Sequence, residues 1–398
     1  MPLADEPPVD APPPSAGPSD VPVADAPPPV PSFPAAIEVR DLDWQQLRTM
    51  VDAQAIRARM RPAVERMEAL LDRVGGPGML FDVDREHAAD RVIRIASAID
   101  AGPLWIIGDL HGDLLALEAS LAFIHREAAP EGGPPRIIFL GDFVDDEGFG
   151  LELLVRLFEL IVEAPDRVCV IAGNHDEALS YDGSRFASSV SPSDFSEFLN
   201  ANLADESIVR AGKLALRLTA HAARALFFPE GLLVSHGGFP LVDLHPALEA
   251  KGDWNDPACL SDFVWARAHP KARRKLPNRF ARGSQFGYED FADFCALTAR
   301  LGRPITHLVR GHDHVEARYA IYPAYRAHPV LTTVALSRRL PREGFGPYER
   351  APTLARVVAR ALPQVYQLYP PADLINELYP QPLRAEGSGP EAGEDDPE

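Results

Sequence analysis

Short runs of apolar residues recur through the middle of the chain, and each run ends in a polar motif that contains glycine. The runs occupy residues 104–107, 136–140, 168–172, 232–235 and 307–309. Runs of this length are typical of strands that are buried on both faces of a sheet. Amphipathic segments at 113–127 and 150–163 follow the first two runs, so the order strand, loop, helix repeats. The pattern predicts an α/β fold with the five motifs at the carboxyl ends of strands, where α/β sheets collect their ligands.

The segments on either side of this repeat have a different pattern. Helical spacing of apolar residues at 43–73 and 86–100 predicts helices before the motifs. After the motifs, residues 329–337 have the composition of a further strand, and residues 351–377 have helical spacing. The expected domains are therefore 36–100, a helical N-terminal extension; 101–340, the motif-bearing domain; and 341–380, a C-terminal helical extension.

Composition separates two tails from this body. Of the 40 prolines among 398 residues, 13 lie in residues 1–34. Residues 1–36 contain five acidic residues and no Lys or Arg, and residues 385–398 contain six acidic residues and no basic one. Such segments bury too little apolar area to offset the entropy of ordering. We therefore expect disordered acidic tails at 1–35, which is proline-rich and a candidate site for partner proteins, and at 381–398.

Charge and composition exclude several classes of protein. The net charge is -19, of which the tails contribute 11 negative charges, so about -8 remains for the body. Binding of nucleic acid through phosphate contacts needs a cationic surface, so it is not expected. No apolar run approaches the ~20 residues of a membrane helix, and the first residues lack the basic and apolar regions of a secretory signal. The three cysteines exclude a disulfide framework. We expect a cytoplasmic protein that binds no membrane.

The polar side chains at the strand ends combine carboxylate, imidazole and amide groups. They are Asp109, His111, Asp142, Asn174, His175, His236, His312 and His314. This set suits divalent ions such as Mn, Fe or Zn, and the absence of thiolates argues against a structural zinc site. A carboxylate shared by two ions can hold them ~4 Å apart, and such a pair activates water and orients a phosphoryl group. Each motif alone also occurs in ordinary turns or cores, so the prediction of a metal site rests on their joint occurrence.

The five motifs together resemble those of a known family. In order they are Gly108-Asp109-Leu110-His111-Gly112, Gly141-Asp142-Phe143-Val144-Asp145, Gly173-Asn174-His175-Asp176, His236-Gly237-Gly238 and Arg310-Gly311-His312. This order resembles the calcineurin-like metallophosphoesterases, and more closely their phosphoprotein phosphatase branch, which includes the protein serine/threonine phosphatases and the bacterial bis-nucleoside tetraphosphatases. The resemblance covers roughly residues 100–340 and implies a layered fold of β-sheets flanked by helices.

The resemblance implies two divalent metal ions per chain, with Mn as the expected metal and Fe or Zn as alternatives. The first ion would be bound by Asp109 and His111, the second by Asn174, His236 and His312, with Asp142 as the bridge. His314 belongs to a Gly-His-Asp-His ending that is usually absent from the phosphatase branch, so it is either a ligand of the first ion or an outer neighbour.

The resemblance also implies a catalytic mechanism. A metal-bridging hydroxide would attack the phosphorus, and no covalent enzyme intermediate would form. His175 would be the general acid that protonates the leaving oxygen, and Asp145 would orient it, as a histidine acid at neutral pH requires.

The second motif departs from the family at its end. It reads Asp145-Asp146-Glu147-Gly148 where the branch usually has Asp-Arg-Gly, so the arginine that binds substrate phosphate is missing. Another guanidinium should replace it, because arginine binds phosphate in a bidentate manner. Arg282, at the end of a basic stretch over 267–282, and Arg310 are the candidates. Asp146 would lie near the phosphate or, alternatively, point to solvent or cap the next helix.

Three functions remain open. The first is a phosphatase of phosphomonoesters, with phosphoserine or phosphothreonine proteins as substrates. The second is a hydrolase of dinucleoside polyphosphates or polyphosphate, which the missing arginine favours. The third is a non-catalytic scaffold, which the complete ligand set with His175 and Asp145 disfavours.

Overall fold

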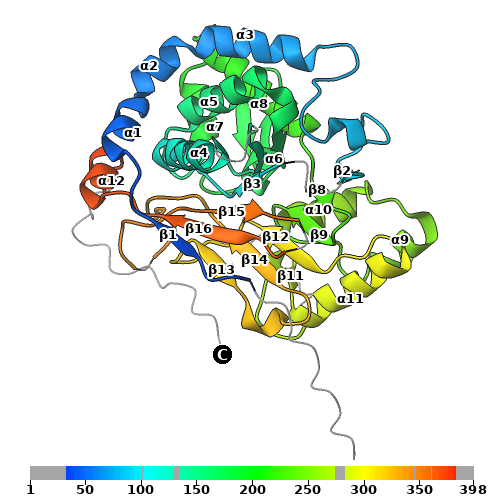
Figure 1. The fold of residues 1–398 in the computed structure, drawn as a ribbon. Coiled ribbons are helices and arrows are strands. Elements are labelled where there is room, and N and C mark those ends of the chain that lie inside the picture. Colours follow the sequence, from blue (N-terminus) through cyan, green and yellow to red (C-terminus); the bar gives the residue numbers. More distant parts are fainter. Residues whose placement is uncertain are drawn as a thin grey trace, which may run out of the picture. The chain divides into compact units, whose positions relative to one another are not determined.

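The computed structural model describes residues 33–97, 99, 102–129, 134–273, 283–344, 346–359 and 361–381. Two six-stranded sheets form its framework (Figure 1). The first sheet has the order β1 (Ile37–Val39), β16 (Gln364–Leu368), β15 (Thr353–Val357), β3 (Leu104–Ile107), β4 (Arg136–Phe139), β5 (Val168–Val170). The second has the order β13 (Tyr319–Ile321), β14 (Val330–Thr333), β12 (His307–Arg310), β9 (Leu232–Ser235), β8 (Ala225–Phe227), β2 (Val92–Arg94).

Helices cover the outer face of each sheet. The first sheet shares a core with α1 (Trp44–Met50), α2 (Ala53–Ala58), α3 (Met60–Leu71), α4 (Leu114–Ala128), α5 (Gly150–Glu163), α7 (Asp194–Ala201), α8 (Glu206–His221) and α12 (Ala372–Leu378). The second shares a core with α9 (His245–Lys251), α10 (Pro257–Trp265) and α11 (Tyr288–Arg300). Short elements complete the chain: α6 (Asn174–Ala178), the pair β6 (Leu179–Tyr181) and β7 (Phe186–Ser188), and the pair β10 (Arg267–Ala268) and β11 (Gln285–Phe286).

The two sheets pack face to face, which explains the continuous apolar runs. In β3, Trp105 and Ile107 face the helices, whereas Leu104 and Ile106 belong to the core between the sheets. Leu331 of the second sheet lies in that same core. Since successive side chains of a strand point to opposite faces, a strand in this position needs apolar residues at every position. The order of layers is therefore helices, sheet, sheet, helices, and the expected layered α/β fold is confirmed.

Parallel pairing brings the motif-bearing strand ends to one edge. Strands β3, β4 and β5 are parallel neighbours, and so are β9, β12 and β14. The helices expected at 113–127 and 150–163 are α4 and α5, and the segment 43–73 forms α1, α2 and α3. The strand expected at 329–337 is β14.

Two of the predicted helical segments are wrong. In 86–100, the described residues contain strand β2 and no helix, because Val92 and Ile93 pair with β8. In 351–377, the prediction is wrong for the first part, which forms β15 and β16, and holds only at the end, where the short helix α12 lies. Strand β15 is buried between β3 and β16, so its apolar residues face two cores, and Pro363 cannot continue a helix.

The expected domain boundaries do not separate the sheets. Strands from both flanking regions, β1 and β16, belong to the same sheet as β3. Phe33 is buried in the core between the sheets, so the packed body begins before residue 36. Most of the two expected tails, residues 1–32 and 382–398, lies outside the described residues. Within the described part, no helix has the length and apolar character needed to cross a membrane.

Candidate active site

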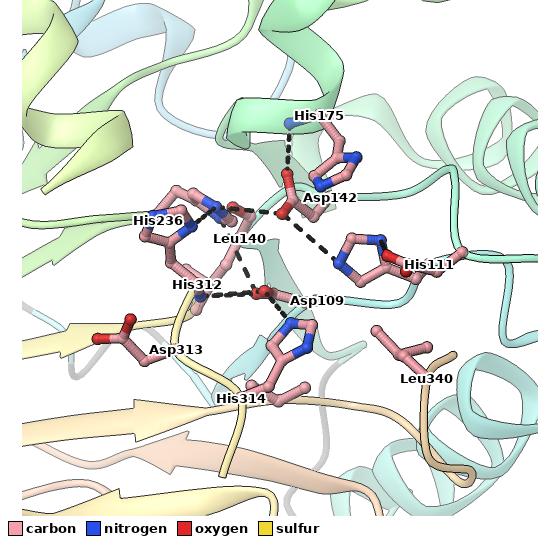
Figure 2. A network of polar contacts seen from close by, with 12 residues as sticks. Asp109, His111, Leu140, Asp142, His175, His236, His312, Asp313, His314 and Leu340 are labelled. Carbon is pink, nitrogen blue, oxygen red and sulfur yellow. Dashed lines mark hydrogen bonds and ion pairs between the residues drawn. The ribbon is translucent and has the colours of Figure 1, made fainter. Parts of the chain in front are cut away.

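Side chains from five strand ends meet at the edge where the parallel strands terminate (Figure 2). In chain order the contributors are Asp109 and His111 after β3, Asp142 after β4, Asn174 and His175 in α6 after β5, His236 after β9, and His312 and His314 after β12. The structure thus brings together all eight residues that the sequence placed at strand ends. All of them are buried except His314, whose side chain is 9% exposed.

One group of ligand atoms surrounds Nε2 of His236. This atom lies 3.1 Å from Oδ1 of Asn174, 3.2 Å from Nδ1 of His312 and 3.4 Å from Oδ2 of Asp142. Ligand atoms bound at about 2.1 Å to one ion lie about 3 Å from each other, so these four atoms have the spacing of a coordination shell. The residues that the resemblance assigns to the second ion therefore fit a divalent metal.

A second group lies around Asp109. Its Oδ2 atom is 3.1 Å from Nε2 of His314, and the ligand atoms of Asp109, His111 and His314 lie within 4.8 Å of one another. Nε2 of His111 is 3.6 Å from Oδ2 of Asp142, the same oxygen that approaches His236. Asp142 therefore borders both groups, as a bridging carboxylate would, and His314 lies at the distance of a ligand.

Hydrogen bonds orient the ligand histidines. The Nδ1 atoms of three rings each have an acceptor: the Val144 carbonyl for His111 (2.9 Å), the Leu140 carbonyl for His236 (2.9 Å) and the Glu343 carboxylate for His314 (3.1 Å). Each bond leaves Nε2 directed at the cluster, which is how proteins fix metal-binding histidines.

The cluster has the electrostatics of a cation site. Burial lowers the pKa of His111 well below its usual value, so this ring is neutral and can bind metal. Burial alone would also lower the pKa of His236, but the carboxylates of Asp142 and Asp109 outweigh it and raise this pKa to about 9. The same carboxylates would favour any other positive charge at this place.

His175 and Asp145 form a buried pair beside these groups. Nδ1 of His175 lies 2.7 Å from Oδ2 of Asp145, whose other oxygen accepts the N–H of Phe195 at 3.0 Å. Burial alone would lower the pKa of His175, but the Asp142 carboxylate and the hydrogen bond to Asp145 raise it. The ring lies edge-on to the ring of His111, with centroids 4.8 Å apart.

The backbone at the site is held in unusual conformations. Of eight non-glycine residues with positive φ in the described part of the chain, six are at the site: His111, Asp142, Asp145, Asp146, Glu147 and His312. Such conformations cost free energy and persist where the surroundings impose them. Arg338 donates to the carbonyls of Asp146 (2.7 Å) and Glu147 (3.0 Å), and Asp194 accepts both of their N–H groups (2.9 and 3.1 Å). These hydrogen bonds hold the loop in the conformation that places Asp145 next to His175.

The two arginines expected to bind phosphate are not part of the described cluster. Arg310 is fully buried, and its guanidinium donates to the carbonyl of Gly237, to Asp313 and to Thr332. Asp313 points away from the ligand atoms in Figure 2. Arg310 therefore holds the loop after β12 through the side of that loop that faces away from the ligand cluster. Arg282 lies outside the described residues.

Sequence reasoning missed Arg342 and Glu343. Arg342 follows the last motif by a long interval and belongs to no motif, so no signal in the sequence marked it. Its guanidinium lies 2.9 Å from Oδ2 of Asp146, 3.3 Å from Nε2 of His111 and 3.4 Å from Nε2 of His175. Asp146 is buried, and the residue before α5, Phe149, makes no side-chain cap, so Asp146 neither points to solvent nor caps that helix.

Comparisons with known proteins identify relatives. A serine/threonine-protein phosphatase 4 catalytic subunit from Kluyveromyces lactis is 40% identical over 77 residues, which are 19% of this chain and 22% of the relative. A serine/threonine-protein phosphatase 6 catalytic subunit from Drosophila melanogaster is 26% identical over 199 residues, which are 49% of this chain and 60% of the relative. Less than two thirds of either relative is therefore matched.

A solved protein serine/threonine phosphatase from Saccharomyces cerevisiae, with similarity to human phosphatase PP5, aligns over 77% of this chain and 83% of its own, with a TM-score of 0.46 and 14% identity. The sequence profile of the calcineurin-like phosphoesterase family matches residues 102–316, which is more than half of the chain. All five motifs lie within this match. The chain therefore belongs to the calcineurin-like phosphoesterase family, and its phosphatase relatives agree with the resemblance to the phosphoprotein phosphatase branch.

Proposed function

We propose that this protein is a dinuclear metal-dependent phosphoester hydrolase. The observation that carries the proposal is the position of the His175–Asp145 pair directly beside two convergent groups of ligand atoms. A scaffold has no need for a buried, carboxylate-oriented histidine next to a metal site. Family membership supports the same reaction class.

The residues divide into metal ligands and proton-transfer groups. Asp109, His111 and His314 would hold one ion, Asn174, His236 and His312 the other, and Asp142 both. When bound, such ions neutralise the phosphoryl oxygens and activate water at neutral pH.

The remaining groups act on the leaving oxygen. Asp145 holds Nδ1 of His175, so the transferable proton is on Nε2, which faces the cluster. The backbone N–H of His175 also donates to Oδ1 of Asp142 at 2.9 Å, which fixes the bridging carboxylate relative to the acid. His175 would give its proton to the leaving oxygen as the phosphorus–oxygen bond breaks.

The substrate that we propose is a phosphorylated serine or threonine of a protein. The names of the relatives and the motif order support this choice. Hydrolysis of dinucleoside polyphosphates or polyphosphate is the second candidate, because an aspartate replaces the usual phosphate-binding arginine at position 146.

A substrate panel after loading with Mn tests both candidates. The panel contains phosphopeptides, nucleotides, a dinucleoside polyphosphate and polyphosphate, and elemental analysis gives the Mn content. We expect about two ions per chain, hydrolysis that chelator abolishes and Mn restores, and highest kcat/KM on phosphopeptides. A folded protein that takes up no metal and hydrolyses nothing would contradict the proposed function, and a preference for anhydrides would select the second candidate.

A further inference from the structure

Position 146 carries a negative side chain where the resemblance predicts a positive one. The phosphoprotein phosphatase branch that the motifs resemble usually has an arginine here, whereas this chain has an aspartate with no solvent exposure. The loop around it is fixed, because Arg338 and Asp194 bind its backbone on both sides. The structure therefore holds Asp146 in a defined position at the site. A negative charge at this position would repel a phosphate unless a cation lies beside it.

Arg342 is that cation. Its guanidinium contacts Asp146 at 2.9 Å and also approaches the Nε2 atoms of His111 and His175 at 3.3 and 3.4 Å. One of these nitrogens is a proposed metal ligand, and the other carries the proposed catalytic proton. A group that touches both lies where the phosphoryl oxygens of a substrate must lie.

The segment that carries Arg342 is anchored by its neighbour. The Glu343 carboxylate binds buried Arg318 at 2.6 and 2.9 Å, accepts the N–H of Leu340 at 3.1 Å and contacts His314 at 3.1 Å. Arg342 itself is 36% exposed, so its guanidinium can reach a ligand that enters from solvent. Three other arginines are described near the site, and all are bound to protein oxygens: Arg310 and Arg338 are buried, and the partly exposed Arg267 binds Asp313 and the carbonyl of His312.

We propose that Arg342 binds the substrate phosphate and that Asp146 is the positioning residue that orients its guanidinium. The arginine of the second motif has thus been replaced by one from a distant loop, and an aspartate holds it in place. A guanidinium suits this role because it stays charged and offers paired donors to two phosphate oxygens. The inference rests on the proposed function and specifies its phosphate site.

The test measures binding of inorganic phosphate to the Mn-loaded protein by calorimetry, with Mn content measured for each variant. We expect Arg342→Ala to weaken phosphate binding about tenfold or more with unchanged Mn content, and Arg342→Lys to weaken it less, because one ammonium keeps the charge but loses the paired donors. In turnover assays, Arg342→Ala should raise KM for a phosphomonoester. Arg326→Ala, which removes an exposed arginine elsewhere, is the matched control and should leave both quantities unchanged.

A second pair of variants tests the role of Asp146. Oδ2 of Asp146 also lies 3.2 Å from Nδ1 of His111, so the variants are compared at equal Mn content. Asp146→Asn should then weaken phosphate binding by a smaller factor than Arg342→Ala, and the double variant should be no weaker than Arg342→Ala alone, since a residue that positions Arg342 acts on phosphate through it. Additive losses would contradict that role.

Equal phosphate affinity in Arg342→Ala and the unmodified protein, with Mn bound in both, would overturn the inference and leave the proposed hydrolase standing. If Arg342→Ala then also binds Mn more tightly, the guanidinium only occupies the place of an ion. A protein that takes up no Mn and hydrolyses no ester would overturn the proposed function as well.

Discussion

A histidine that protonates a leaving oxygen must hold its proton near neutral pH and present it from a fixed nitrogen. His175 meets both needs, because the Asp142 carboxylate and the buried bond to Asp145 outweigh the effect of burial and raise its pKa, and the bond to Asp145 also fixes Nδ1. We expect His175→Asn to lower kcat at least about 100-fold, since general acid catalysis contributes ~10²–10⁴-fold. The loss should be larger for an alkyl phosphate than for p-nitrophenyl phosphate, whose leaving group needs little protonation.

His307→Asn is the matched control for this change. His307 begins β12, at the opposite end of the strand from His312, and burial lowers its pKa to about 4, so it is a neutral histidine away from the site. Turnover should survive this change, and both variants should keep their Mn. Full activity of His175→Asn on the alkyl phosphate would show that another group is the acid.

A second prediction at this scale concerns stability and pH. Burial raises the pKa of Asp262 to about 6, although this carboxylate accepts the N–H of Leu241 at 3.0 Å. A carboxyl group with a raised pKa binds protons more strongly in the folded state, so its cost is absent below the unfolded pKa of ~3.9 and grows until the folded pKa is passed. Asp262→Asn keeps the acceptor without the charge. Its Tm should exceed that of the unmodified protein at pH 8, and the difference should shrink towards pH 4.5; a constant difference would contradict the assignment.

Among the secondary structure elements, those with local signals could be predicted from the sequence. Each apolar run ends within two residues of the end of its strand, and α5 has the bounds that its periodicity indicates. Strands β15 and β16 could not be predicted, because β15 pairs with β3 and β16 pairs with β1, both far away in the chain. The ligand cluster was predictable since glycine-bearing motifs mark strand ends. Arg342 was not, because its place depends on the contacts of Glu343 with Arg318 and His314.

The helices before the family match are part of the same core, which leads to a prediction at this scale. Helix α3 packs on α5 and α8, and Met67 of α3 has no exposed surface. Met67→Ala should lower the free energy of unfolding by about 2–5 kcal/mol, because it leaves a cavity in a packed core. Arg66→Ala, at the exposed neighbouring position, should change it by less than about 0.5 kcal/mol. Denaturant titration measures both, and equal effects would contradict the packing of α3 as a structural layer.

At the scale of the whole molecule, the metal site joins the two sheets. Asp109 and Asp142 follow strands of the first sheet, and His236 and His312 follow strands of the second. Four of the proposed ligands therefore come from opposite sides of the core between the sheets. The hydrophobic packing of that core sets the distance across the site, so the fold prepares the ligand geometry before any ion binds.

This arrangement predicts that metal stabilises the entire fold. An ion that binds ligands from both sheets binds the folded state and not the unfolded chain, so it raises stability by about 2.7 kcal/mol per independent site at 100 times its Kd. Thermal unfolding in Mn should therefore show a Tm higher by several degrees than in chelator. Asp142→Asn should abolish most of this rise, because Oδ2 of Asp142 lies between the two groups of ligand atoms. Asp262→Asn, the same change outside the cluster, should keep the full rise. If Asp142→Asn responds to Mn as the unmodified protein does, the ions bind elsewhere and the bridging role of Asp142 is wrong.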